Sequence, residues 1–321
     1  MSLEEFDEEL ESGTLTLLAE IETLSRRVWE GRLSRARIDD WLSGFADESE
    51  REHALYLLSQ FMFFGQREVR TILSAVYEDL FRTPIIHNIR RNEARSLTVA
   101  EIERRFQDEL SKTRFLGCGS PAESGYHLLY YFRQESMLWR ELFVHPHELL
   151  FRADDGTERA AIPDLRHVVF IDDICGSGHQ ALDYYRQIVR PLKMHLPHVK
   201  VHYLVMIATE HGLARVRGAN LYDRTESVFL LDESFRVFGP QSRYYYDDRL
   251  SFRKGDGDAI VRKYGHLFEY GPYGYADGQL LLGMYYNVPD NVLPIIWSDE
   301  KGWRPIFRRY PKLMLQEHDE T

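Results

Sequence analysis

The sequence predicts an α/β protein in which a parallel sheet is flanked by helices, with a helical region before it and a hood of strands and loops after it. Residues 1–110 have the apolar spacing of helices and no strand pattern. From residue 111, short apolar runs alternate with helical patterns, which is typical of right-handed βαβ units. From about residue 235 the chain is rich in Tyr, Gly and Pro and has no clear period. We therefore expect an N-terminal helical region at 1–110 and an α/β domain with a C-terminal hood at 111–321.

The composition is that of an ordinary globular protein. Of 321 residues, 44% are apolar and 28% are charged, which excludes a disordered or collagen-like chain. A net charge of −11 is unfavourable for a general nucleic-acid-binding protein. With only Cys118 and Cys175, a disulfide framework and a four-thiolate zinc site are both excluded. The acidic N-terminus and the lack of an apolar run of about 18 residues favour a cytoplasmic protein without a membrane segment.

Five helices are expected in the first region. Pro84 is expected to end the fourth of them, because proline donates no backbone hydrogen bond. Thr98 and Glu101 have the spacing of a capping box at the start of the fifth. The helices are predicted at residues 15–29, 37–45, 50–64, 68–81 and 99–110.

The α/β region alternates strands with helices. The helix at 179–192 is amphipathic, so it is expected to cover one face of the sheet. The strands are predicted at residues 114–118, 166–173, 199–208 and 227–231. The helices between them are predicted at residues 126–142, 179–192 and 210–216.

The segment 168–179 carries the strongest functional signal. It combines a buried strand, the acids Asp172 and Asp173 at its carboxyl edge, a loop of small residues and the start of a helix. Ligands of parallel α/β sheets bind at such carboxyl edges, and loop N–H groups before a helix can hold a phosphate. The two acids would repel a phosphate, so a sugar phosphate, with hydroxyls for the acids, satisfies the whole segment. The expected phosphate-binding loop consists of Ile174, Cys175, Gly176, Ser177 and Gly178.

This segment resembles the signature of type I phosphoribosyltransferases, enzymes that use phosphoribosyl pyrophosphate (PRPP). The signature has four apolar strand residues, two acids, three variable residues and then Thr/Ser-Gly, and residues 168–178 match it position by position. The resemblance implies that Asp172 and Asp173 hold the ribose 2′ and 3′ hydroxyls and that the loop holds the 5′-phosphate. Two positions depart from it. Gln180 replaces a small hydroxyl residue, and Gly176 stands where purine-salvage members often have an Asp base, so no general base is predicted.

Such enzymes also have a pyrophosphate loop after an earlier strand of the sheet. Residues 115–125 lie in this place, and their glycines and serines can donate to a second anion. An ordinary strand–helix turn, with an acid in the first helical turn, explains the same residues equally well. The candidate pyrophosphate-loop residues are Gly119, Ser120, Glu123 and Ser124.

The C-terminal region narrows the resemblance to one family. Residues 286–297 are similar to the Asn-Thr-Pro-Asn-Asn-Thr-Leu-Pro-x-x-Trp run of the PRTase-CE family of prokaryotic conflict systems, with departures at Val288, Asp290 and Val292. The resemblance extends over roughly residues 35–310. It implies a phosphoribosyltransferase-like fold, a role in antiviral defence and partner proteins.

Four residues of this region form a candidate acceptor hood. Asparagine amides can hydrogen-bond a base or acceptor, and aromatic rings can stack on it. A rigid loop whose asparagines satisfy backbone groups, around a core tryptophan, is the alternative interpretation. The hood residues are Tyr275, Asn287, Asn291 and Trp297.

Two functions stay open, with a third behind them. As an enzyme, the protein would transfer phosphoribose from PRPP to an unidentified acceptor and release pyrophosphate, with Mg²⁺ arriving on the phosphates and no dedicated metal site. As a sensor, it would bind PRPP or a nucleotide without reaction and signal through its N-terminal helices to a protein partner. Gln180 and the missing base favour the sensor. A ribosyl hydrolase has only Glu123 and Asp277 as remote candidate acids.

Overall fold

The chain divides into two compact units. The computed structural model describes residues 3–309 except 94, 120–123, 155, 163 and 247–251. Unit 1 consists of residues 1–65 and 235–321, and unit 2 consists of residues 66–234. This division differs from the expected boundary at residue 110. Residues 66–110 pack within unit 2, and the C-terminal region belongs with the first helices.

Unit 1 is held together by buried aromatic side chains. Phe45 packs edge-on against both Trp41 and Trp303, with ring centroids 5.3 and 5.2 Å apart. The indole N–H groups of Trp41 and Trp303 both donate to the carbonyl oxygen of Ile295, at 2.9 Å each. The core therefore joins the N-terminal helices to the C-terminal segment. The elements are α1 (Leu3–Arg27), α2 (Arg35–Leu42), α3 (Glu48–Ser59), β1 (Met62–Phe64), α11 (Lys254–Gly265), β8 (Leu282–Met284) and α12 (Pro294–Trp297).

Two elements of unit 1 differ from the sequence prediction. The helix expected at 50–64 ends at Ser59, and β1 follows it and pairs in parallel with β8. Three residues are too few to display the alternation of a strand. Helix α11 was also missed, because Gly255 and Gly257 lower its helical propensity. Gly257 has a packing reason, since a Cβ there would clash with the Tyr245 hydroxyl.

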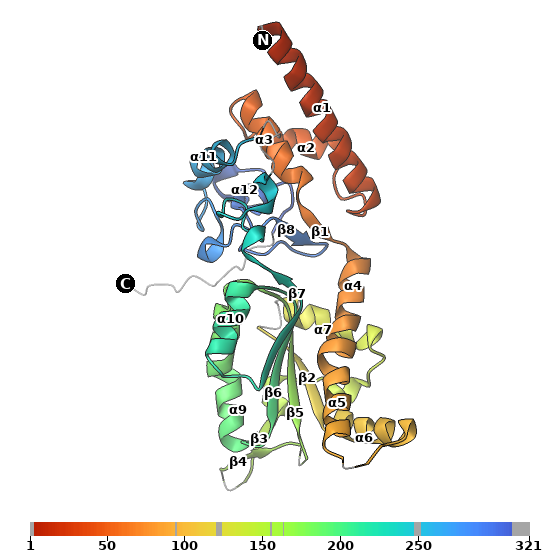
Figure 1. The fold of residues 1–321 in the computed structure, drawn as a ribbon. Helices are drawn as coiled ribbons and strands as arrows, with labels where there is room; N and C mark the ends of the chain where they lie inside the picture. Colours follow the sequence, from red (N-terminus) through yellow and green to blue (C-terminus); the bar gives the residue numbers. More distant parts are fainter. Residues whose placement is uncertain are drawn as a thin grey trace, which may run out of the picture. The chain divides into compact units, whose positions relative to one another are not determined.

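Unit 2 contains the predicted parallel sheet. Its four described strands run in the order β2-β5-β6-β7, and each pair is parallel. Figure 1 shows this sheet between α4–α7 and α9–α10. The fold class is thus confirmed. The elements are α4 (Gln66–Ala75), α5 (Thr83–Arg91), α6 (Val99–Ser111), β2 (Thr113–Gly117), α7 (Ser124–Glu135), β3 (Leu150–Arg152), β4 (Glu158–Ala160), β5 (His167–Cys175), α8 (His179–Tyr184), α9 (Arg190–His195), β6 (Lys200–Thr209), α10 (Glu210–Gly218) and β7 (Arg224–Leu231).

The central strands of the sheet in unit 2, β5 and β6, are buried on both faces. On one face Phe170 of β5 packs edge-on against Tyr184 of α8, at 5.2 Å between ring centroids. On the other face Phe115 of β2 packs against Phe81 and Phe132, at 5.2 and 5.3 Å. Burial on both sides explains why β5 and β6 appear in the sequence as continuous apolar runs rather than alternating ones.

Two prolines lie inside helical stretches of unit 2 without ending them. Pro84 lies in the first turn of α5, directly after a π-helical segment at Val76–Arg82. Pro191 lies in the first turn of α9, directly after a second π-helical segment at Tyr185–Val189. Proline lacks an N–H and its ring collides with the carbonyl four residues earlier, and a wider turn relieves both problems. The expected helix end at Pro84 was therefore wrong.

Candidate functional site

The candidate site lies near the carboxyl end of β5, at the centre of the sheet. β5 pairs with β2 on one side and β6 on the other, and its register places Asp172 beside Val205. The strand runs two residues beyond the predicted end, to Cys175. Asp172, Ile174 and Cys175 are therefore held in register with β6.

Asp172 is enclosed in the protein. Its side chain is 2% exposed, and its Oδ2 accepts a hydrogen bond of 2.8 Å from the hydroxyl of Tyr203 on β6. Its Oδ1 accepts a 3.0 Å bond from the N–H of Asp173. Burial, and then the neighbouring Asp173 charge, raise the pKa of Asp172 well above its ordinary value. This carboxyl group favours the protonated form.

Asp173 has different hydrogen-bond partners from Asp172. It is 7% exposed, and its Oδ1 accepts a hydrogen bond of 2.8 Å from the N–H of Ile174. The two acids therefore do not form a symmetric pair. Asp172 is bonded to Tyr203 of β6, whereas Asp173 is bonded to the N–H of the next residue on its own strand.

The loop after β5 is fixed against the start of α10. Thr209 Oγ1 donates to the carbonyl of Gly176 at 2.6 Å and accepts from the N–H of Gly212 at 2.9 Å. A Cβ at Gly212 would clash with the Gly176 carbonyl, and Gly178 has φ +78° and also meets Gly212. In the described part of the chain, the N–H groups of Gly176 and Ser177 donate no hydrogen bond. Such paired N–H groups are suited to hold an anion.

A positive side chain lies beside this loop. Arg215 of α10 donates to Nε2 of His179, which directly follows the loop, and to Nε2 of His211 at 3.0 Å. Sequence reasoning missed Arg215 together with Tyr203, Thr209 and Gly212. The only available signal was their position at the carboxyl end of the next strand, which does not indicate which side chain faces the loop.

The candidate pyrophosphate loop is described only in part. Ser120 and Glu123 lie outside the described residues, and for Ser124 only the backbone at the start of α7 is described. Gly119 has φ +98°, which favours glycine. The loop follows β2, and β2 pairs directly with β5. This segment therefore begins at the same edge of the sheet as the loop after β5.

The four hood residues belong to unit 1. Asn291 Nδ2 donates to the carbonyl of Tyr275 at 2.9 Å, and Trp297 Nε1 donates to the carbonyl of Val292 at 2.8 Å. Trp297 is 7% exposed, so most of its ring is covered by protein. Among the described residues, the buried Oδ1 of Asn287 has no hydrogen-bond partner. Asn291 and Trp297 thus have structural partners, as the alternative interpretation of this region requires.

The cysteines and other metal-binding side chains form no visible centre. Cys118 and Cys175 are free and buried, and burial raises the pKa of the Cys175 thiol to about 12. Across the described residues, no cluster of three or more His, Cys, Asp or Glu side chains is arranged to hold a metal ion. In the same part of the chain, no helix has the length and apolar content needed to cross a bilayer.

A parallel sheet with an acidic pair and a small-residue loop at the end of a central strand places the protein in the phosphoribosyltransferase-like class. The PRTase-CE family model matches residues 38–309, and the chain belongs to this family. The match agrees with the extent of the resemblance found in the sequence.

Solved structures with similarity to the chain include two phosphoribosyltransferases and a protein from Aquifex aeolicus. A Helicobacter pylori xanthine-guanine-hypoxanthine phosphoribosyltransferase is 11% identical, with 53% of this chain and 89% of that chain covered and a TM-score of 0.29. An Aeropyrum pernix orotate phosphoribosyltransferase is 18% identical, with 39% and 62% covered and a TM-score of 0.23. The AQ2163 protein of Aquifex aeolicus is 14% identical, with 62% and 86% covered and a TM-score of 0.29. Comparison with curated proteins gives no match.

Proposed function

We propose that unit 2 binds PRPP, or a related ribose 5-phosphate, at the carboxyl end of β5. The observation that carries this proposal is the loop at Gly176–Gly178, which is fixed against Gly212 and has two N–H groups without a partner in the described chain. The loop holds the 5′-phosphate through these groups and the Ser177 hydroxyl. Arg215 adds positive charge beside it. Asp173 accepts hydrogen bonds from the ribose hydroxyls, and Asp172 with Tyr203 fixes the strand beneath it.

The proposed reaction is transfer of phosphoribose to an acceptor. The acceptor nucleophile attacks C1 of PRPP, the bond from C1 to the pyrophosphate oxygen breaks, and the bonding pair leaves with pyrophosphate. Preorganised donors that face the developing negative charge stabilise this departure. The glycine-rich segment after β2 is the proposed place for those donors, since β2 is the neighbour of β5.

Mg²⁺ is the metal that this chemistry requires, because it neutralises pyrophosphate as that group departs. Mg²⁺ in proteins is commonly held by one or two carboxylates together with substrate phosphates and water. Asp173 could supply one such carboxylate, and the remaining ligands would come from PRPP and water. The residues present thus fit a metal that arrives with its substrate.

A second function, PRPP sensing without reaction, is favoured by Asp172. Its carboxyl group is buried and bonded to Tyr203, so only Asp173 is left for the ribose, and Gly176 supplies no base. In that case PRPP binding signals to a protein partner. By family context, either form would serve antiviral defence.

The test is a calorimetric titration of PRPP with Mg²⁺. We expect the wild-type protein to bind, and Asp173→Asn to bind at least about tenfold more weakly, because the charged acceptor for two hydroxyls is lost. The matched control is Asp183→Asn, which removes an exposed acid of α8 that pairs with Arg186. Equal affinity in Asp173→Asn and wild type would contradict the proposal. Pyrophosphate release with a nucleobase pool then distinguishes the transferase from the sensor.

A further inference from the structure

Unit 2 has a polar cavity away from the loop after β5. We call it the α5–α6 pocket. It has a volume of about 500 Å³ and lies between the end of α5 and the segment that leads into α6. α6 ends at the amino ends of the strands, where Arg166 before β5 pairs with Asp108 and Glu109. The pocket is lined by His87, Arg90, Arg91, Glu93, Arg95, Ser96 and Leu97.

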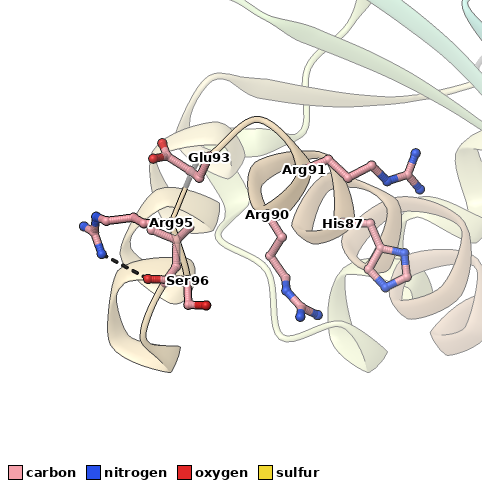
Figure 2. A pocket seen from close by; sticks show the side chains of 7 residues that line it. His87, Arg90, Arg91, Glu93, Arg95 and Ser96 are labelled. Carbon is pink, nitrogen blue, oxygen red and sulfur yellow. Dashed lines mark hydrogen bonds between the residues drawn. The ribbon is translucent and has the colours of Figure 1, made fainter.

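Helix geometry concentrates positive charge in this pocket. His87, Arg90 and Arg91 are spaced i, i+3 and i+4, so they lie on one side of α5. Figure 2 shows His87 and Arg90 extending from this helix in a similar direction, with Arg91 pointing away from Arg90 and Arg95 extending away from the helix on the next segment. All of these side chains are exposed to solvent. The protein has a net charge of −11, so the positive charge of this cluster is opposite in sign to that of the whole protein.

Ion pairing leaves two of the arginines without a counter-charge. Glu93 pairs with Arg105, and Arg95 pairs with Glu101 at 2.5 Å. Among the described residues, no carboxylate lies within ion-pair distance of Arg90 or Arg91. The pocket therefore carries an excess of two positive charges from adjacent residues of one helix end.

The helix dipole is the competing explanation for basic residues at this place. A helix C-terminus carries about half a negative charge, which favours one nearby cation. Two full guanidinium charges exceed this partial charge, so the pocket stays positive. The dipole also does not explain why Arg95, on a different segment, lines the same cavity.

We propose that the α5–α6 pocket binds a compact anion with at least two linked phosphate groups, such as pyrophosphate or the polyphosphate of a nucleoside. Guanidinium groups pair with phosphate oxygens through two parallel hydrogen bonds, and two uncompensated groups match two phosphates. The described lining has one apolar residue, Leu97, and no Phe, Tyr or Trp ring. The large aromatic surfaces on which successive bases stack are therefore lacking, which favours a small anion over single-stranded nucleic acid.

The test is a titration of inorganic pyrophosphate into the full chain in the presence of EDTA. Arg90→Gln/Arg91→Gln removes the two uncompensated charges, and Arg104→Gln/Arg190→Gln removes two exposed arginines that do not line the pocket. We expect at least about tenfold weaker binding in the first variant and wild-type affinity in the second. Thermal unfolding of both variants verifies that the fold is kept.

The same variants separate this pocket from the loop after β5. If pyrophosphate binds at that loop instead, its affinity should be unchanged by Arg90→Gln/Arg91→Gln. PRPP binding with Mg²⁺ should be the same in both double variants. Inorganic phosphate, pyrophosphate and ADP as separate ligands show whether free or nucleoside-linked phosphate is preferred. Equal pyrophosphate affinity in the two variants, no pyrophosphate binding by the wild type, or tighter binding of a single-stranded oligonucleotide would each overturn the proposal.

Discussion

Two adjacent aspartates of β5 differ in their hydrogen-bond partners. Asp172 is enclosed and accepts from the Tyr203 hydroxyl, while Asp173 accepts from the N–H of Ile174. The carboxyl group of Asp172 therefore links β5 to β6 through Tyr203. This difference has a consequence for stability that can be measured.

Asp172→Asn is expected to become more stable relative to wild type as pH rises from about 4 to 7. The pKa of Asp172 is raised by burial, so above the unfolded value of 3.8 the folded state holds more protons than the unfolded state. Wild-type stability then falls with rising pH by at most about 1.4 kcal/mol per pH unit, and an amide removes that fall. Urea unfolding at pH 4, 5.5 and 7 measures the difference.

Asp223→Asn is the matched control, with the opposite sign. Burial raises the pKa of Asp223, but hydrogen bonds from Lys193 and from the N–H of Val201 outweigh it, and the net shift is downward. The stability from this group is present above pH 3.8 and lost as pH falls. The variant should therefore be less stable than wild type at pH 7, and the gap should close in acid. The same pH trend in both variants would contradict the account of Asp172.

At the level of elements, the loop after β5 depends on close contact with α10. Gly212→Ala would place a Cβ against the Gly176 carbonyl. We expect a loss of about 1–3 kcal/mol in stability and weaker PRPP binding, because the loop must move. Gly218→Ala on the same helix is the control, since a Cβ there meets nothing within 4 Å. Calorimetry and urea unfolding measure both variants, and equal effects would show that the contact does not position the loop.

A histidine pair links the amino ends of β5 and β6 to α6. His167 Nδ1 and His202 Nε2 are 3.0 Å apart, and His167 Nε2 is 3.2 Å from Glu109 Oε2. Burial, followed by the neighbouring His167, lowers the pKa of His202 to about 3. With His202 neutral and donating, His167 accepts at Nδ1 and donates to Glu109.

This pair predicts acid sensitivity. His202 is neutral in the fold and takes up a proton near pH 6.5 when unfolded, so its contribution is present above pH 6.5 and is lost as pH falls toward 3. His202→Gln is expected to flatten the decline of stability between pH 6.5 and 4, which is at most about 1.4 kcal/mol per pH unit. The exposed His198→Gln is the control. A decline of the same slope in His202→Gln would show that other groups cause it.

The sequence predicted the elements that have strong local signals. The capping box at Thr98 is present, with the Glu101 carboxylate accepting from the Thr98 N–H at 2.9 Å. β5 and the loop after it occur where the acidic pair and the glycines indicated. β1 and α11 were missed because three residues show no period and because Gly255 and Gly257 weaken a helical pattern.

The long-range partners of the candidate site could not be predicted from the sequence. Tyr203 and Thr209 reach the acidic pair and the loop only through the register of β5 with β6, and a shift of one residue would turn Tyr203 to the other face. The packing of residues 66–110 within unit 2 could not be predicted from the sequence either. It depends on Phe81 and Phe106, which pack together and cover β2 through Phe115.

For the whole molecule, the division into two units predicts which fragment folds. Residues 66–234 form one continuous segment with its own sheet and helices on both faces. We expect this fragment to be soluble and to unfold in one cooperative transition by circular dichroism. A fragment of residues 111–234 should not unfold in one cooperative transition, because it lacks Phe81 and Phe106, which cover the sheet. Cooperative unfolding of 111–234 but not of 66–234 would contradict the division.

The central claim is that the loop at Gly176–Gly178 holds the phosphate of a ribose phosphate. Hydrogen–deuterium exchange of the full chain, with and without PRPP and Mg²⁺, tests it most directly, because Gly176 and Ser177 have N–H groups without a partner in the described chain. The account predicts slower exchange in peptides that cover residues 174–180 when PRPP is present. Unchanged exchange there, at PRPP concentrations that saturate binding, would contradict it.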